Sequence, residues 1–255
     1  MSKIPTMSVV LLTCNRLKVT RETLEYLLAT THVDFELVIV HNNNQTPEAQ
    51  KVKEYFKNLK IKTDNQHLKE VVKVFNKTNR GVAGGRNDGI YHSSGKHKVV
   101  IDDDILVPDC WAETALKIIK RIPRIATVGV SVETNKFPVK TENGVSFQLK
   151  DGNIGGALIV VPARTFKRVG YFCEDYGIYG MEDADYYMRI KALGMYNAYI
   201  HPMKARHIDP ENDKKYRAFK NKVYQKGSVP MRMFTKNNQK YKSGKGLFLP
   251  YRPII

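Results

Sequence analysis

Residues 98–104 read Lys-Val-Val-Ile-Asp-Asp-Asp, an apolar run that ends in three aspartates. The run is typical of a buried strand, and open α/β sheets bind ligands outside the carboxyl ends of their strands. Three adjacent carboxylates repel one another unless a cation lies among them. Asp102 and Asp104 point to the same side of an extended chain, and Mg²⁺ or Mn²⁺ accepts such carboxylates together with phosphate oxygens. The stretch predicts a metal site; the alternative is a solvated acidic turn that leads into a helix.

Strand and helix patterns alternate on both sides of this stretch. Strands are expected at 8–13, 35–40, 71–75, 98–101, 126–132, 156–161 and 196–200. Helices are expected after an N-cap at Thr20, and at 47–59, 83–91, 108–122 and 182–193, the last closed by Gly194. Asn143-Gly144 predicts a hairpin turn. The alternation predicts an α/β fold with a Rossmann-like, mostly parallel central sheet flanked by helices.

The composition of the 255-residue chain is that of a globular protein. It is 42% hydrophobic and 26% charged, which excludes wholesale disorder, collagen and coiled coil. Its apolar runs are far shorter than the roughly 20 residues of a membrane-spanning helix, and its first residues lack the apolar core of a signal peptide. The cysteines, Cys14, Cys110 and Cys173, form neither a disulfide framework nor a paired metal motif. We therefore expect a reducing, cytoplasmic setting.

The net charge of +17 is concentrated near the C-terminus. Residues 211–255 hold 12 Lys and Arg but only two Asp and Glu, so we place a boundary near residue 210 and expect a short basic C-terminal extension. Aromatic residues interleave with its cations: Tyr216, Phe219, Tyr224, Phe234, Tyr241, Phe248 and Tyr251. Such a segment favours an anionic partner, either nucleic acid or a membrane surface at which the protein would be peripheral. The alternative is that the aromatic residues simply pack the extension onto the core.

Three further motifs carry candidate chemistry. Glu182-Asp183 opens the last predicted helix, whose N-terminus keeps a carboxylate ionised and able to act as a general base; favourable dipole placement alone is the alternative. His207 follows the last predicted strand and could complete a metal site, although a lone histidine is more often structural. Residues 79–87 combine small residues with Arg86, which suits phosphate, but fit neither the dinucleotide nor the P-loop pattern.

Taken in order along the chain, these motifs resemble the family 2 glycosyltransferases of GT-A fold. The matching segments are Ser8 to Arg16, the second strand with Asn42, residues 79–87, Asp102-x-Asp104, Gly155-Gly156 with Arg164, Val169-Gly170, Glu182-Asp183 and His207. The resemblance covers about residues 7–210. It implies a nucleotide-sugar half over 1–132, an acceptor half over 133–210, and metal-dependent, inverting transfer of one sugar from a nucleotide-sugar, UDP-sugar first, to an acceptor hydroxyl.

The resemblance also implies a role for each matching residue. Asp183 would be the catalytic base, Glu182 would help to hold a sugar, and Asp104 and His207 would bind Mn²⁺ or Mg²⁺. The nucleotide-sugar would contact Thr13, Asn15, Arg16, Asn42, Asn79, Arg86, Asn87, Asp102 and Asp103. The acceptor would contact Gly155, Gly156 and Trp111.

Two departures from the family pattern affect specificity. His41 stands where an aspartate usually contacts the base, which leaves the nucleotide open. The Gln-x-x-Arg-Trp motif of processive synthases is absent, which favours single-sugar transfer. An anionic acceptor is expected, either a hydroxymethylated pyrimidine in DNA or a lipid-linked or teichoic-type glycan. A nucleotidyltransferase and a non-catalytic basic nucleic-acid-binding protein remain as rivals.

Overall fold

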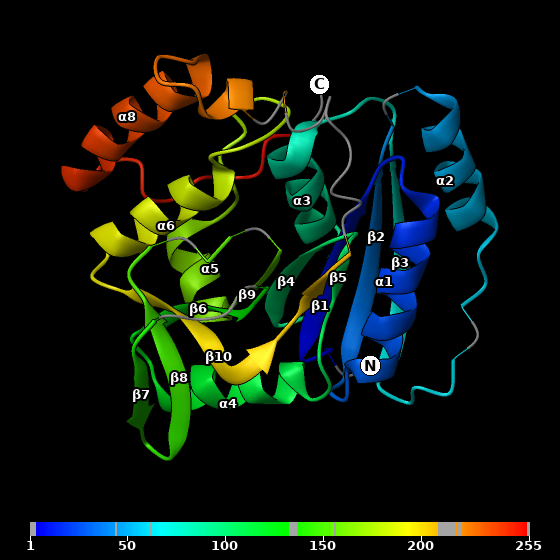
Figure 1. Cartoon of the computed structure of the whole chain (residues 1–255), viewed down its shortest axis with the longest axis horizontal. Helices are drawn as coiled ribbons and strands as arrows, with labels where there is room; N and C mark the ends of the chain where they lie inside the picture. The colour runs from blue at the N-terminus through cyan, green and yellow to red at the C-terminus, as the bar shows by residue number, and fades with distance from the viewer. Residues whose placement is uncertain are drawn as a thin grey trace.

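A nine-stranded sheet in the order β3-β2-β1-β4-β9-β6-β10-β8-β7 runs through the middle of the molecule (Figure 1). The computed structural model describes residues 4–43, 45–61, 63–132, 137–152, 154–155, 157–208, 218 and 221–253. The strands are β1 (Met7–Thr13), β2 (Phe35–Asn42), β3 (Leu68–Asn76), β4 (His97–Asp102), β6 (Ile125–Ser131), β7 (Val139–Glu142), β8 (Val145–Lys150), β9 (Leu158–Val161) and β10 (Tyr196–Lys204). Only β8 and β9 run against the others, so the mostly parallel sheet is confirmed.

Helices cover both faces of this sheet (Figure 1). One face packs against α1 (Leu17–Thr30), α2 (Pro47–Asn58) and α4 (Trp111–Arg121). The other packs against α3 (Gly81–Tyr91), α5 (Ala163–Val169) and α6 (Glu182–Ala192), and α8 (Val229–Lys242) lies outside α6. Successive residues of β1 serve opposite layers, Val9 and Leu11 the first and Val10 the second. The central strands are apolar without interruption because both of their faces are buried.

The structure corrects the predicted starts of two helices and confirms the predicted hairpin. Thr20 is not an N-cap: α1 begins at Leu17, and the Thr20 hydroxyl is buried within it, 2.8 Å from the Arg16 carbonyl oxygen. The start of α4 is also later than the prediction of residue 108. Asn143 and Gly144 have φ values of 49° and 69°, which suit a two-residue type I′ turn between β7 and β8.

The C-terminal residues 221–253 lie against the body of the molecule rather than apart from it. α8 was not predicted, although Ser228 caps its first turn by accepting a hydrogen bond from the Met231 N–H. Tyr241 is buried, whereas Tyr224 and Phe248 are about half exposed, so packing onto the core accounts for only part of the aromatic content. The proposed boundary near residue 210, Tyr216 and Phe219 lie outside the described residues. Within the described part of the chain, no helix combines the length and apolar character that crossing a bilayer requires.

Candidate active site

A cavity of about 540 Å³ opens at the carboxyl ends of β1, β2 and β4. In the sheet register Leu12 pairs with Asp102 and Thr13 pairs with His41, so the residues that follow these strands meet at one edge. Most of the predicted site residues line this cavity: Thr13, Asn15, Arg16, Asn42, Asn79, Arg86, Asp102, Asp103, Asp104, Glu182, Asp183 and His207. Residues from distant parts of the chain therefore converge where an α/β sheet binds its ligands.

Two arginines of the chain relieve the repulsion among the three aspartates. The Arg16 Nη1 atom lies 2.7 Å from Asp104 Oδ2, and its Nη2 atom is paired with Asp103. The Arg86 Nη2 atom lies 2.6 Å from Asp102 Oδ1. The sequence predicted a cation among these acids but not that arginine side chains supply part of the positive charge. Arg16 was expected in the nucleoside pocket; it lines the same cavity while paired with the acids.

The three aspartates differ in their readiness to lose a proton. Burial raises the pKa of Asp103 to about 6 and also raises the pKa of Asp102. Burial alone would raise the pKa of Asp104 as well, but the hydrogen bond from His207 and the charge of Arg16 outweigh it and lower that pKa. Asp104 is therefore the carboxylate most firmly held in its charged form, which is the form that a metal ion requires.

Asp104 and His207 together suit a divalent metal. β5 (Ile105–Leu106) and β11 (Arg206–His207) form a two-stranded antiparallel ladder that brings His207 Nε2 within 3.2 Å of Asp104 Oδ2. The Ile208 N–H donates to the Asp104 carbonyl oxygen at 2.9 Å and closes the ladder. One carboxylate oxygen and one imidazole nitrogen facing a cavity form a donor set that Mn²⁺ accepts, with a substrate's oxygens completing the shell.

A second acidic pair faces the cavity from the N-terminus of α6. Glu182 and Asp183 occupy the first turn of this helix, where the dipole favours negative charge. The Arg86 Nη1 atom lies 3.3 Å from Glu182 Oε1, so Arg86 joins α6 to Asp102 at the end of β4. Burial, assisted by the charge of Asp183, raises the pKa of Glu182 to about 7. Glu182 is thus divided between its charged and neutral forms near neutrality.

Several predicted contacts fall away from the cavity. Asn87 is buried and donates to the Phe172 carbonyl oxygen at 2.9 Å, so it fixes the chain before α6 rather than touching a nucleotide. Trp111 is fully buried at the start of α4 and cannot reach an acceptor, and Gly155 does not line the cavity. Gly156 lies outside the described residues. His41 is also buried away from the cavity, and burial followed by the charge of Lys53 lowers its pKa to about 4.

The cavity also contains residues to which the sequence analysis gave no individual role in the site. Gly81 and Val82 line it at the start of α3, and Ile178 and Tyr179 line it from the loop before α6. A Cβ atom on Gly81, whose φ is +72°, would lie 2.5 Å from the Gly177 carbonyl oxygen, so this close approach requires glycine. Tyr224 reaches the same cavity from the C-terminal segment. Residues 178 and 179 lie in a loop, where hydrophobic periodicity predicts nothing, so only the folded structure shows that they line the cavity.

Two solved structures that share this fold hold a nucleotide or a nucleotide-sugar together with Mn²⁺. The chain superposes with a TM-score of 0.59 on the mannosyltransferase PcManGT from Pyrobaculum calidifontis, solved with GDP-Man and Mn²⁺; identity is 16%, and the match covers 94% of this chain and 70% of that one. The TM-score is 0.63 with GalNAc-T7, solved with UDP, GalNAc and Mn²⁺, at 13% identity over 96% of this chain and 59% of that one. The fold and site define the class of GT-A glycosyltransferases.

The sequence comparisons place the chain within that class. The model of glycosyl transferase family 2 matches residues 8–174, and the chain belongs to this family. It is also 32% identical, over 111 residues, to a glucosyl-dolichyl phosphate glucuronosyltransferase of Haloferax volcanii. That match covers 44% of this chain and 32% of the relative, so the chain matches about a third of the relative's length. Family membership confirms the resemblance and leaves both rival functions without support.

Proposed function

We propose that this chain transfers a single sugar from a nucleotide-sugar to an acceptor hydroxyl with inversion at the anomeric carbon. The observation that carries the proposal is that two pairs of side chains converge on one cavity. Asp104 and His207 form the first pair, and the two carboxylates of Glu182 and Asp183 form the second. The first pair suits a metal-bound diphosphate and the second an acceptor. UDP is the first choice of nucleotide, and the buried His41 has no contact with the cavity that would argue against it.

In the proposed reaction Asp183 takes the proton of the acceptor hydroxyl, and the resulting oxygen attacks the anomeric carbon. The bond from that carbon to the diphosphate oxygen breaks, and its electron pair leaves with the nucleoside diphosphate. Mn²⁺ or Mg²⁺ held by Asp104 and His207 would neutralise charge on the diphosphate. Arg16 lies beside Asp104 and supplies a fixed positive charge at the same edge of the cavity. Glu182, with its pKa of about 7, can donate a hydrogen bond to a sugar hydroxyl or accept one.

The proposed acceptor is anionic and lipid-linked. Residues 221–253 contain eight Lys and Arg, all exposed, and no Asp or Glu. Arg232, Lys236 and Lys240 recur every four residues and therefore share one side of α8. Tyr224, Val229 and Phe248 are exposed among these cations, a combination that suits an anionic membrane surface. The name of the Haloferax relative, which contains a dolichyl phosphate, favours a lipid-linked acceptor over hydroxymethylated DNA.

The proposed reaction is tested by comparing the same substitution at two aspartates, Asp183 in the cavity and Asp151 outside it. Asp183→Asn should lower Mn²⁺-dependent hydrolysis of a UDP-sugar by about 10²- to 10⁴-fold, the usual share of a general base, while UDP affinity changes little. Asp151→Asn is the matched control, because Asp151 is exposed and paired with Lys191 outside the cavity. Full activity in Asp183→Asn would remove this residue from the mechanism. Failure of every nucleotide-sugar to raise the melting temperature of the wild type would contradict the proposed function itself.

The acceptor is tested by label transfer. A radiolabelled UDP-sugar is incubated with the protein and either a glycosylated polyisoprenyl phosphate in vesicles or DNA that contains 5-hydroxymethylcytosine. We expect label in the lipid fraction. Label in DNA alone would reverse the choice of acceptor and leave the proposed transfer reaction intact.

A further inference from the structure

The last described residues of the chain are tied to the layer that builds the cavity. Residues 247–252, the C-terminal strap, run beside the loop that precedes α6. The Leu249 N–H donates to the Val169 carbonyl oxygen at 3.0 Å, and the Tyr171 N–H donates to the Leu249 carbonyl oxygen at 2.9 Å. A Cβ atom on Gly170 would lie 2.0 Å from that Leu249 oxygen, so the strap can approach only because residue 170 is glycine.

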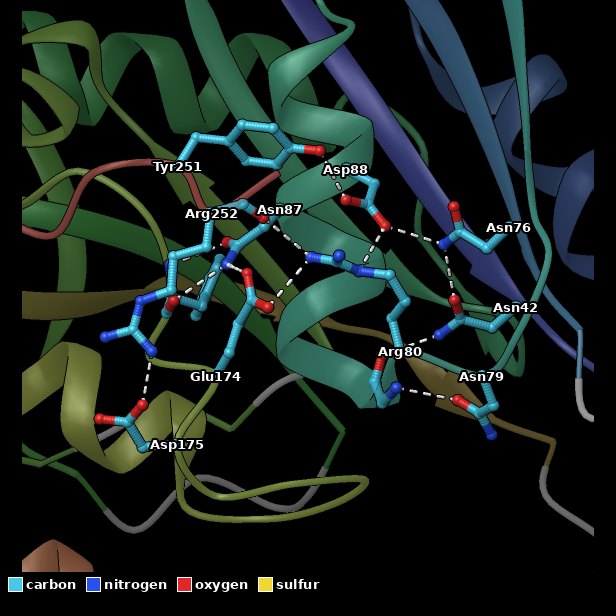
Figure 2. A network of polar contacts seen from close by, with 12 residues as sticks. Asn42, Asn76, Asn79, Arg80, Asn87, Asp88, Glu174, Asp175, Tyr251 and Arg252 are labelled. Carbon is cyan, nitrogen blue, oxygen red and sulfur yellow. Dashed lines mark hydrogen bonds and ion pairs between the residues drawn. The ribbon is translucent and has the colours of Figure 1, made fainter. Parts of the chain in front are cut away.

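Tyr251 attaches the strap to α3. Its ring stacks on Tyr91 with centroids 4.1 Å apart and planes 11° from parallel. Its hydroxyl donates to Asp88 Oδ1 at 2.9 Å, as Figure 2 shows. Burial, followed by this hydrogen bond, raises the pKa of Tyr251 to about 12, so the hydroxyl keeps its proton and remains a donor at physiological pH. The contact therefore joins a strap residue to a buried carboxylate.

A chain of hydrogen bonds leads from Asp88 to the wall of the cavity (Figure 2). Asp88 Oδ2 accepts from Asn76 Nδ2 at 2.8 Å, and the same amide donates to Asn42 Oδ1 at 2.8 Å. Asn42 Nδ2 in turn donates to the Gly81 carbonyl oxygen at 2.8 Å. Asn42 and Gly81 both line the cavity on its proposed nucleotide side. Each donor and acceptor in this series is specified by its neighbour, so the orientation of the Asn42 amide depends on Asp88.

A parallel set of contacts holds the strap and the loop against the start of α3. The Arg80 Nε atom lies 3.0 Å from Asp88 Oδ2, and its Nη2 atom donates to Glu174 Oε2 at 3.0 Å and to the Arg252 carbonyl oxygen at 3.2 Å. The Arg252 guanidinium is paired with Asp175 at 2.5 Å. Arg80 is therefore shared by α3, the loop and the strap, and movement of the strap would disturb all three.

We propose that Tyr251 is a positioning residue for the nucleotide pocket, acting through Asp88 and Asn76 on Asn42. This inference rests on the proposed function. The alternative is that the strap merely stabilises the fold, as a second tyrosine of the same C-terminal segment does. The Tyr241 hydroxyl donates to Asp185 Oδ2 at 2.8 Å, a bond of the same type and nearly the same length. The other side-chain partners of Asp185, Tyr176 and Arg189, do not line the cavity, whereas the series from Asp88 ends at Asn42, which does.

The experiment compares Tyr251→Phe with Tyr241→Phe in the full chain. Each variant removes one hydroxyl and keeps the ring, so both should lower the melting temperature modestly. Titration calorimetry with UDP and with GDP, each with Mn²⁺, should show affinity reduced about three- to tenfold in Tyr251→Phe and unchanged in Tyr241→Phe. In the hydrolysis assay the loss should fall on the KM of the nucleotide-sugar, with kcat within about twofold.

The possible outcomes separate this inference from the proposed function. Equal nucleotide affinity in wild type and Tyr251→Phe would overturn the positioning role and leave the proposed function standing. An equal loss of affinity in both variants would also overturn it, because a general loss of stability would then explain the effect. A wild type that binds neither UDP nor GDP would overturn the proposed function and this inference together.

Discussion

Two buried arginines of this protein, Arg189 and Arg86, differ in whether the carboxylates that they pair with are enclosed or face the cavity. Arg189 on α6 is fully enclosed: it donates to Asp185 Oδ1 at 2.9 Å and to the carbonyl oxygens of Val169 and Tyr171. The other Asp185 oxygen accepts from Tyr176 and Tyr241, both at 2.8 Å. This set, the closed cluster, has every carboxylate oxygen occupied within the protein.

Arg86 is equally buried, but its partners face the cavity. Its Nη2 atom pairs with Asp102 and its Nη1 atom with Glu182, and the Asp102 side chain is 36% exposed. Burial raises the pKa of both carboxyl groups, that of Glu182 to about 7, and both line the cavity. A buried charge by itself therefore does not distinguish a stabilising cluster from a binding site. A closed cluster is expected to stabilise the fold, whereas the open cluster of Arg86, Asp102 and Glu182 is expected to serve binding.

The largest expected effect is in the closed cluster. Asp185→Asn leaves the Arg189 charge buried without a counter-charge and should lower the free energy of unfolding by about 3–5 kcal/mol. Urea unfolding measures this change, and UDP affinity of the folded protein should stay at the wild-type value. Glu142→Gln removes an exposed pair with Arg124 and should cost less than about 1 kcal/mol. A comparably small effect of Asp185→Asn would mean that the closed cluster does not stabilise the fold.

A substitution in the open cluster should affect nucleotide binding more than stability. Arg86→Met should weaken UDP binding in the presence of Mn²⁺ by about 10- to 100-fold, because it removes hydrogen bonds between charged groups in the cavity wall. The free energy of unfolding should fall less than in Asp185→Asn, since Asp102 and Glu182 can take up protons when their cation is lost. Calorimetry and urea unfolding of both variants test the distinction. The reverse ranking of the two variants in the two assays would show that the closed cluster serves binding and the open cluster serves stability.

The smallest expected effect is on the pH dependence of stability. Glu182 has a pKa of about 7 in the folded chain, above its ordinary value of 4.5, so the folded state holds the proton more tightly than the unfolded state. The stabilisation from this proton is complete below pH 4.5 and is lost as pH rises to about 7. Glu182→Gln should reduce the loss of unfolding free energy over that range by about 1–2 kcal/mol. Parallel pH profiles for the two proteins would show that the folded state does not hold the Glu182 proton more tightly than the unfolded state.

Sequence alone predicted the core of the fold but not its periphery. Strands such as β1 and β2 are continuous apolar runs, and burial on both faces gives that pattern directly. α8 has a polar sequence whose helical form depends on packing against α6, so periodicity gave no clear signal. The misplaced start of α1 has a similar cause, because Thr20 serves a tertiary contact with Asp103 at 3.0 Å rather than a cap.

The site was predictable where a motif ends a strand or begins a helix, and less so elsewhere. Asp104, His207 and Asp183 were proposed from such positions, and all three line the cavity. Asn87 belongs to a matching motif, yet its side chain turns inward to Phe172, which sequence spacing cannot reveal. Tyr224 comes to the cavity from a part of the chain that shares no element with the sheet, so its place depends on tertiary packing alone.

The position of the single tryptophan determines what its fluorescence can report. Trp111 lies fully buried in the layer of α1 and α4, with its indole N–H 3.3 Å from Thr31 Oγ1, and it does not line the cavity. Its fluorescence emission should therefore change when the whole molecule unfolds and should stay the same when a ligand binds in the cavity. Tyr179 and Tyr224, by contrast, line the cavity and are placed to respond to a bound nucleotide.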